Sequence, residues 1–297
     1  KHHEVNMRNN EKRLGESQGQ SLPEDVAAAT QAASQPPPQG LAYVVPTEFV
    51  ELPSQGKFYP ADHPLHNKEV VEIKYMTAKE EDILTSQSLI KRGLAIERLI
   101  ANILVDKKIK TETLLAGDRS AILVAARISG YGRIYETSVS CPSCATTSKH
   151  VFDLEESQPQ RNCFDEEYLS DKEVEFANGF FFIALHKSKV RVGLRLLTGK
   201  DEMRLMSIKK KKKANDVDSV ITDQLSNIIV SVNEDHDSWN IRRFVDTMPI
   251  SDSKYIRNLY KQLVPSLDLT QAFSCMSCGH IEDMEVPFNT EFFWPDE

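Results

Sequence analysis

The chain has 297 residues and a formal net charge of −8. Hydrophobic residues make up 40% of it and charged residues 27%, which is ordinary for a soluble protein with one large or two small domains. The acidic balance argues against a general nucleic-acid binder, because phosphate contacts need a concentrated basic face. The longest apolar run is far too short to span a bilayer, so we expect no membrane insertion.

Residues 1–42 are expected to form an extended or disordered arm. Residues 1–40 contain no Phe, Trp or Tyr, are rich in Gln, Ser, Ala, Glu and Pro, and end in a proline-rich run. Such a composition cannot bury enough apolar surface to offset the entropy of ordering the chain. A short Ala-rich helix at about 24–33 is the only regular element we expect there.

Residues 43–76 have the character of strands and loops. Turn signals occur at 54–56, and residues 70–75 alternate as in a half-buried strand. A helical region, 77–132, follows, and Thr77-Ala-Lys-Glu80 at its start is a capping box. We expect a break at Gly93, a further helix capped by Asp118, and a stop at 130–132. This region is expected to form a helical hairpin.

Two Cys-x-x-Cys units lie far apart in the sequence. Each sits between two short alternating stretches that are typical of the strands of a hairpin, which defines a first knuckle at 133–156 and a second at 268–288. A glycine, Gly279, follows the second unit and can adopt the positive φ that turns backbone amides toward sulfur, whereas Ala145 occupies the equivalent place in the first. The four cysteines are Cys141, Cys144, Cys275 and Cys278.

Four thiolates on two knuckles match the tetrahedral Cys₄ geometry of structural zinc, so we expect one zinc ion held as in a zinc ribbon. An iron–sulfur centre or another metal remains an alternative. Two redox dithiols are disfavoured because no helical pattern follows either motif. Two disulfides would suit a secreted protein, but we find no signal peptide, and Cys163 would be left over. A catalytic zinc site is not expected, because such a site keeps an open position.

The segment between the knuckles, 157–267, is too long for a ribbon and should form an inserted α+β lobe. Residues 174–197 read as strands, with 180–185 buried on both faces, and Thr198 should begin a helix that runs to Met206. Further helices are expected at 217–232 and 251–263. The five lysines 209–213 either contact phosphate or an acidic partner, or form a solvated helix end.

No enzyme motif is present: we find no P-loop, nucleophile elbow, His-Glu-x-x-His or EF-hand loop, and we predict no catalytic residues. The C-terminal tail, 289–297, contains Phe292, Phe293 and Trp294. These aromatic residues either complete the core or anchor the chain in a partner protein, because aromatic side chains concentrate binding energy.

Several segments together resemble the T-even-like phage baseplate protein family, which contains hub subunits and hub-assembly proteins of contractile tails. The specific segments are Val50-Glu-Leu-Pro-Ser-Gln-Gly-Lys-Phe-Tyr-Pro60 and the stretch from Glu72 to Thr85, which contains Tyr-Met-Thr-Ala-Lys. Further matching segments lie at 117–132, 196–202, 244–253 and 286–295. The resemblance covers residues 43–295 and implies a virion tail component or a tail assembly factor without known chemistry.

The combined expectation is an α+β protein: a helical hairpin and a Cys₄ zinc-ribbon-like module with a large α+β insertion, preceded by an extended N-terminal arm. We expect it to be a structural component of a contractile phage tail baseplate, assembled in the host cytoplasm and bound to other baseplate and tail proteins in a large multi-subunit assembly. The alternative is a hub assembly factor that is not retained in the mature virion. A nucleic-acid-binding ribbon and a cell-wall hydrolase are disfavoured.

Overall fold

The computed structural model of the protein describes residues 44–201, 203–205, 219–287 and 292–293. The helices and strands of these described residues belong to the unit Val45–Glu297. Helices and several small antiparallel sheets occur together, which confirms the predicted α+β class. The predicted arm at 1–42, its Ala-rich helix and the lysine run at 209–213 lie outside the described residues.

The first structured segment is an antiparallel pair, β1 (Thr47–Glu51) and β2 (Val70–Lys74). Val50 of β1 and Val71 and Ile73 of β2 are buried, because one face of this pair packs on the helices. The loop between the strands, 52–69, contains the Leu-Pro-Ser-Gln-Gly-Lys-Phe-Tyr-Pro segment. Its backbone is closed by several turns, and Leu52 donates to the carbonyl of Glu69 at 2.7 Å.

The helical region follows with α2 (Ala78–Thr85), α3 (Gln87–Arg92), α4 (Ala95–Ile103), the 3₁₀ turn η2 (Thr111–Thr113) and α5 (Ala116–Tyr131). The predicted capping box is confirmed: the Glu80 carboxylate accepts a hydrogen bond from the Thr77 N–H at 2.9 Å. The predicted break is confirmed as well, since Gly93 has φ +70° and ends α3.

The predicted capping role of Asp118 is wrong. Helix α5 begins two residues earlier, and Asp118 is fully buried in its first turn. Its carboxylate accepts hydrogen bonds from the Ser54 N–H (3.0 Å), the Ser54 hydroxyl (2.5 Å) and the Tyr59 hydroxyl (2.8 Å). The Tyr59 oxygen in turn accepts a bond from the Leu115 N–H at 3.0 Å. Asp118 therefore fastens the β1–β2 loop to the start of α5, a long-range contact that no local pattern predicts.

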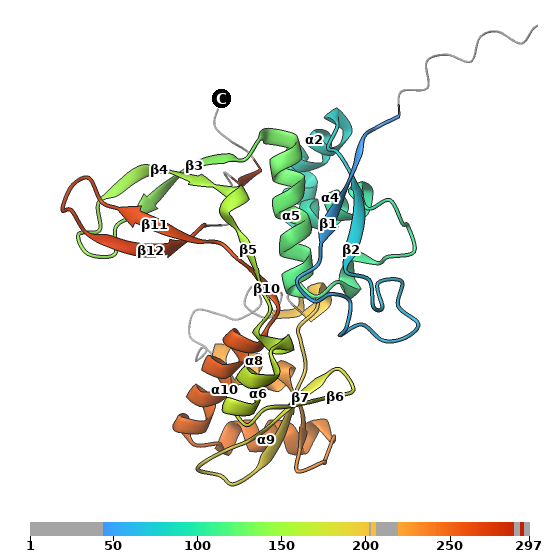
Figure 1. Cartoon of the computed structure of the whole chain (residues 1–297), viewed down its shortest axis with the longest axis vertical. Helices are drawn as coiled ribbons and strands as arrows, with labels where there is room; N and C mark the ends of the chain where they lie inside the picture. The colour runs from blue at the N-terminus through green and yellow to red at the C-terminus, as the bar shows by residue number, and fades with distance from the viewer. Residues whose placement is uncertain (1–43, 202, 206–218, 288–291, 294–297) are drawn as a thin grey trace, which may run out of the picture. The chain divides into compact units, whose positions relative to one another are not determined.

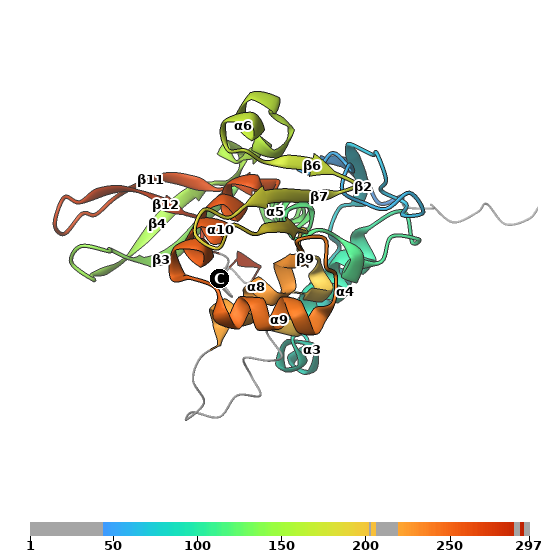
Figure 2. The same ribbon diagram turned by 90° about the horizontal axis from the view of Figure 1, so that it is seen from below.

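Two β-hairpins lie next to each other although they are far apart in the sequence. The first consists of β3 (Ile134–Ser140) and β4 (Thr147–Asp153), and the second of β11 (Thr270–Ser274) and β12 (Ile281–Glu285). They extend side by side away from α5 in both views (Figures 1 and 2). Between them in sequence lies the lobe, which returns to α5 through β10 (Ser266–Asp268). This strand pairs with β5 (Gln158–Gln160).

The lobe contains a four-stranded antiparallel sheet in the order β6 (Glu175–Ala177), β7 (Phe180–Ala184), β8 (Arg191–Leu194) and β9 (Ile229–Val232). The short turns η3 (Leu154–Glu156) and η4 (Asn162–Phe164) and the helix α6 (Glu166–Asp171) lead into it. Helices α8 (Val220–Ile228), α9 (Ser238–Thr247) and α10 (Ile250–Leu263) follow in the lobe.

Two predictions for the lobe need correction. The segment 180–185 is not buried on both faces: Phe181 and Ile183 point into the core, while the guanidinium of Arg191 covers the ring of Phe182 at 4.5 Å. The helix predicted to run to Val232 ends at Ile228, because the alternating residues that follow form β9 and pair with β8. The helix predicted at 251–263 is confirmed as α10.

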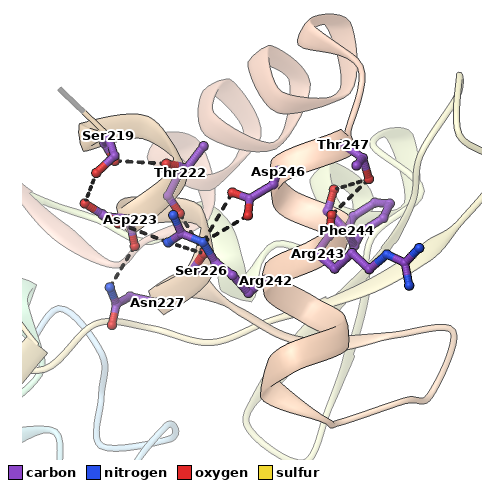
Figure 3. A network of polar contacts seen from close by, with 10 residues as sticks. All are labelled: Ser219, Thr222, Asp223, Ser226, Asn227, Arg242, Arg243, Phe244, Asp246 and Thr247. Carbon is purple, nitrogen blue, oxygen red and sulfur yellow. Dashed lines mark hydrogen bonds and ion pairs between the residues drawn. The ribbon is translucent and has the colours of Figure 1, made fainter. Parts of the chain in front are cut away.

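A polar network joins α8 to α9 (Figure 3). The Arg242 guanidinium on α9 lies 3.0 Å from the Asp223 carboxylate on α8 and 3.2 Å from Asp246 one turn further along α9. It also donates to the Ser226 hydroxyl at 3.4 Å. Because these side chains come from both helices, the network fixes the register in which the two helices pack.

Candidate metal centre

The two Cys-x-x-Cys units form the same turn in the structure. In the first knuckle the Ala145 N–H donates to the Cys141 carbonyl at 2.9 Å, and in the second the Gly279 N–H donates to the Cys275 carbonyl at the same distance. The residue after the second cysteine has a left-handed backbone in both, with φ +56° at Ala145 and +71° at Gly279. The sequence therefore builds two equivalent knuckles, although only one has the glycine that favours this conformation.

The two knuckles bring all four cysteine sulfurs together. The four Sγ atoms lie within 4.8 Å of one another. Cys141 Sγ is 3.7 Å from Cys278 Sγ, and Cys144 Sγ is 3.8 Å from Cys275 Sγ. A tetrahedral zinc ion with Zn–S bonds of about 2.3 Å places its sulfurs about 3.8 Å apart. The separations fit this geometry, and they are far longer than a disulfide bond of about 2.05 Å.

The donor set consists of sulfur alone. No histidine or carboxylate belongs to the group, and no second cluster of His, Cys, Asp and Glu with metal-binding geometry occurs in the described part of the chain. The His150 ring packs on Phe152 and Phe273, with ring centres 4.7 and 5.2 Å away, and His280 pairs with Glu282 at 3.0 Å. Four sulfurs around one centre leave no open position for a substrate or a water molecule, which is the pattern of a structural site.

Hydrogen bonding and the nearby sulfurs shift the pKa values of Cys144 and Cys278 in opposite directions. The hydroxyl and the N–H of Thr146 lower the pKa of Cys144 to about 6. The His280 N–H lowers the pKa of Cys278, but the sulfurs of Cys144, Cys275 and Cys141 raise it to about 11. Four thiolates so close together repel one another, and a divalent cation removes this repulsion. The chemistry of the cluster therefore fits a metal ion held by all four cysteines.

The hairpins that present the cysteines are also joined below the site. The Gln271 side chain on β11 donates to the Asp153 carbonyl at the end of β4 (2.6 Å) and accepts from the Asp153 N–H (3.1 Å). The Gln271 side chain thus forms hydrogen bonds with both the N–H and the carbonyl of Asp153 on the other hairpin. Sequence reasoning missed Gln271, because a glutamine on an alternating strand carries no distinguishing signal.

The structure describes two of the three aromatic residues that were predicted to contact a partner. Phe292 and Phe293 are only 1% and 4% exposed, and the ring of Phe292 packs edge-on against Tyr135 of β3 at 5.2 Å. Their burial favours the core alternative of the two that the sequence left open. A partner contact by Phe292 or Phe293 is not tested by this packing and stays a prediction. Trp294 lies outside the described residues.

The chain matches a known protein family. The family described as T4 bacteriophage base plate protein matches residues 45–294. The chain belongs to this family. No curated protein matches the chain, and no solved structure does. The match begins one residue after the described structure does and covers the β1–β2 loop, the lobe and both knuckles of this baseplate protein.

The family membership agrees with the absence of enzyme motifs in the sequence, and it points to a virion structural protein of the tail baseplate. The predicted resemblance to T-even-like baseplate proteins is confirmed, although the match does not specify the hub or any other subunit position. No helix in the described part of the chain is long and apolar enough to cross a membrane.

Proposed function

We propose that this baseplate protein is a retained structural subunit of a contractile phage tail, which contacts hub or wedge proteins through its N-terminal arm, its inserted lobe and its C-terminal tail. The match of the T4 base plate family over residues 45–294 carries this proposal. Assembly would take place in the host cytoplasm before the particle is released. The chain then has no substrate, and its role is to hold neighbouring subunits in place.

A single structural zinc ion would stabilise this subunit. Cys141 and Cys144 from the β3–β4 hairpin and Cys275 and Cys278 from the β11–β12 hairpin would bind it, so that the ion joins two hairpins that lie far apart in the sequence. Sulfur separations of 3.7 and 3.8 Å support this assignment. The lobe follows the first hairpin in the sequence and precedes the second. A zinc ion bound to both hairpins would therefore hold the two ends of the lobe together.

Mass spectrometry of purified virions tests the structural role. We expect the protein in intact tails, at a fixed ratio to the major tail proteins in the same sample. Its presence in tail assembly intermediates but not in intact tails would contradict the proposal and would favour the assembly factor that leaves before maturation.

A further inference from the structure

A groove of about 820 Å³ lies between the β1–β2 loop, the residues that precede α5, and the lobe. Its floor is apolar and includes the buried side chains of Tyr59, Leu115 and Leu196. The exposed lysines Lys57 and Lys200 line it as well. This size and this combination of an apolar floor with a few polar groups are typical of binding sites in proteins.

The first wall of the groove is held rigidly from below. Asp118, which is fully buried, binds Ser54 and Tyr59 at the two ends of the segment that carries Lys57. A Cβ atom at Gly56 would lie 2.3 Å from the Leu65 carbonyl oxygen, so this turn is closed too tightly for any side chain. A buried carboxylate is costly to desolvate, and here it holds a wall in a fixed position. A preformed wall lowers the entropy that a ligand must lose on binding.

The opposite wall comes from the lobe. The β6–β7 hairpin turns through Asn178 and Gly179, which have φ +54° and +81°, and this tight turn lines the groove. Phe58 ties the two walls together, because its ring lies 5.5 Å from that of Phe181 in β7. Both sides of the groove are therefore fixed relative to each other.

The electrostatics of the groove differ from those of the acidic chain as a whole. Arg195 is neutralised by Asp201, with two contacts of 2.8 Å, so Lys57 and Lys200 face the single lining carboxylate of Glu112. The Lys57 ammonium lies 4.3 Å from the ring centre of Phe164.

The hydrogen bonds of His63, which lines the groove, fit a neutral imidazole. The Leu65 N–H donates to His63 Nδ1 at 3.2 Å, which leaves the proton on Nε2 for the Thr113 hydroxyl oxygen at 2.8 Å. Burial lowers the pKa of His63, against the opposing effect of Asp62. The groove thus presents two exposed lysines, Lys57 over the Phe164 ring and Lys200, beside an apolar floor.

We propose that this groove binds an acidic peptide segment with an aromatic side chain, supplied by a neighbouring baseplate protein. The aromatic ring of the peptide would pack on the apolar floor of the groove. Carboxylates on either side of this ring would form ion pairs with Lys57 and Lys200. The proposal rests on the proposed function only for the source of the segment. Its chemistry rests on the groove alone.

A binding experiment with the full-length chain tests the proposal. The probe is a fluorescein-labelled peptide Asp-Glu-Phe-Asp-Glu, compared with the same peptide carrying Ala in place of Phe and with Lys-Arg-Phe-Lys-Arg. We expect fluorescence anisotropy to detect the acidic Phe peptide best and its affinity to fall with salt, because screening weakens exposed charge pairs. The double variant Lys57→Glu/Lys200→Glu should bind it at least about tenfold more weakly.

Two further variants control for folding and total charge. Lys91→Glu/Lys254→Glu changes the net charge equally, on α3 and α10 and outside the groove, and should bind as the wild type does. Ala61→Trp places a large ring in the groove without removing a lysine and should weaken binding as well. Thermal unfolding of each variant shows whether it folds.

The proposal is overturned if the folded groove variants bind as the wild type does, if the Ala peptide binds equally well, or if millimolar inorganic phosphate displaces the peptide completely, which would indicate a general anion site. These outcomes concern the isolated protein and leave the virion measurement unaffected. Failure of the groove proposal and failure of the structural role are therefore distinguishable.

Discussion

At the scale of single residues, the left-handed position after each cysteine pair offers a direct test of the knuckle geometry. Ala145 and Gly279 occupy equivalent places, and the added Cβ of a Gly279→Ala variant would have no atom within 4 Å. The two positions therefore share a left-handed backbone and differ in the side chain. An L-residue with a side chain loses about 1–2 kcal/mol in this conformation.

We predict that Gly279→Ala lowers the free energy of unfolding by about 1 kcal/mol. Ala145→Gly should raise it by about 0.5 kcal/mol, because the strain that is relieved exceeds the extra entropy of glycine in the unfolded chain. Urea unfolding of both variants measures this. A clear loss of stability in Ala145→Gly would contradict the assigned backbone conformation.

The buried carboxylate of Asp118 gives a second prediction at the same scale. Asp118→Ala removes the acceptor for Ser54 and Tyr59 and should cost about 3 kcal/mol of stability. Asp118→Asn keeps an acceptor and a polar partner and should cost much less. The comparison, by urea unfolding, separates loss of the hydrogen bonds from loss of the charge. Equal effects of the two substitutions would contradict this account.

The pH dependence follows from the same residue. Burial raises the pKa of Asp118 above its usual value, although the bonds from Ser54 and Tyr59 oppose this. A carboxyl group with a raised folded-state pKa binds more protons in the folded chain than in the unfolded chain. Its contribution to stability is therefore complete below the unfolded pKa of about 3.9 and is lost as the pH rises through the folded-state pKa. The stability of the wild type relative to Asp118→Asn should fall as the pH rises through that window.

At the scale of elements, Gln271 connects the two hairpins independently of any metal. Gln271→Ala leaves the Asp153 N–H and carbonyl without these partners, and we predict a loss of about 1–2 kcal/mol of unfolding free energy. Gln271→Glu keeps an acceptor for the N–H but loses the donor, so it should lose stability as well. Hydrogen exchange at the Asp153 amide should be faster in Gln271→Ala and less affected in Gln271→Glu, which keeps the acceptor. Unchanged protection of that amide would show that the contact is not formed in solution.

The elements also show which parts of the fold can be read from the sequence. The knuckle strands, the capping box at Thr77, the break at Gly93 and helix α10 were predictable, because each depends on a pattern within a few residues. The strand β9 was not, because its residues fit both a helix and a strand and only pairing with β8 decides between them. The role of Asp118 depends on Ser54, which is distant in sequence, and no local pattern contains it.

The candidate site also has parts that the sequence predicts and parts that it does not. The repeated Cys-x-x-Cys spacing predicts that the four cysteines lie together, because metal sites with ligands from two knuckles have this recognisable pattern. The amide contact of Gln271 and the burial of Phe292 against Tyr135 depend on how the hairpins pack, and the sequence contains no signal for either. The groove brings together four separate chain segments and could not be predicted before the fold was known.

At the scale of the whole molecule, the two hairpins precede and follow the lobe in the sequence. They meet at the four sulfurs, at the Gln271 contact and at the packing of His150 on Phe273. The metal centre would therefore join the chain segment that enters the lobe to the segment that leaves it, in addition to the pairing of β5 with β10. The groove walls are also held by contacts outside the hairpins, namely those of Asp118 with Ser54 and Tyr59 and that of Phe58 with Phe181. A metal staple of this kind contributes its binding free energy directly to folding.

The metal content of the purified protein tests this central claim most directly. Elemental analysis should find one zinc per chain in the wild type and none in the variant with serine at Cys141, Cys144, Cys275 and Cys278, which should also unfold at a lower urea concentration. A wild-type protein without stoichiometric zinc, or a four-serine variant of equal stability, would contradict the account.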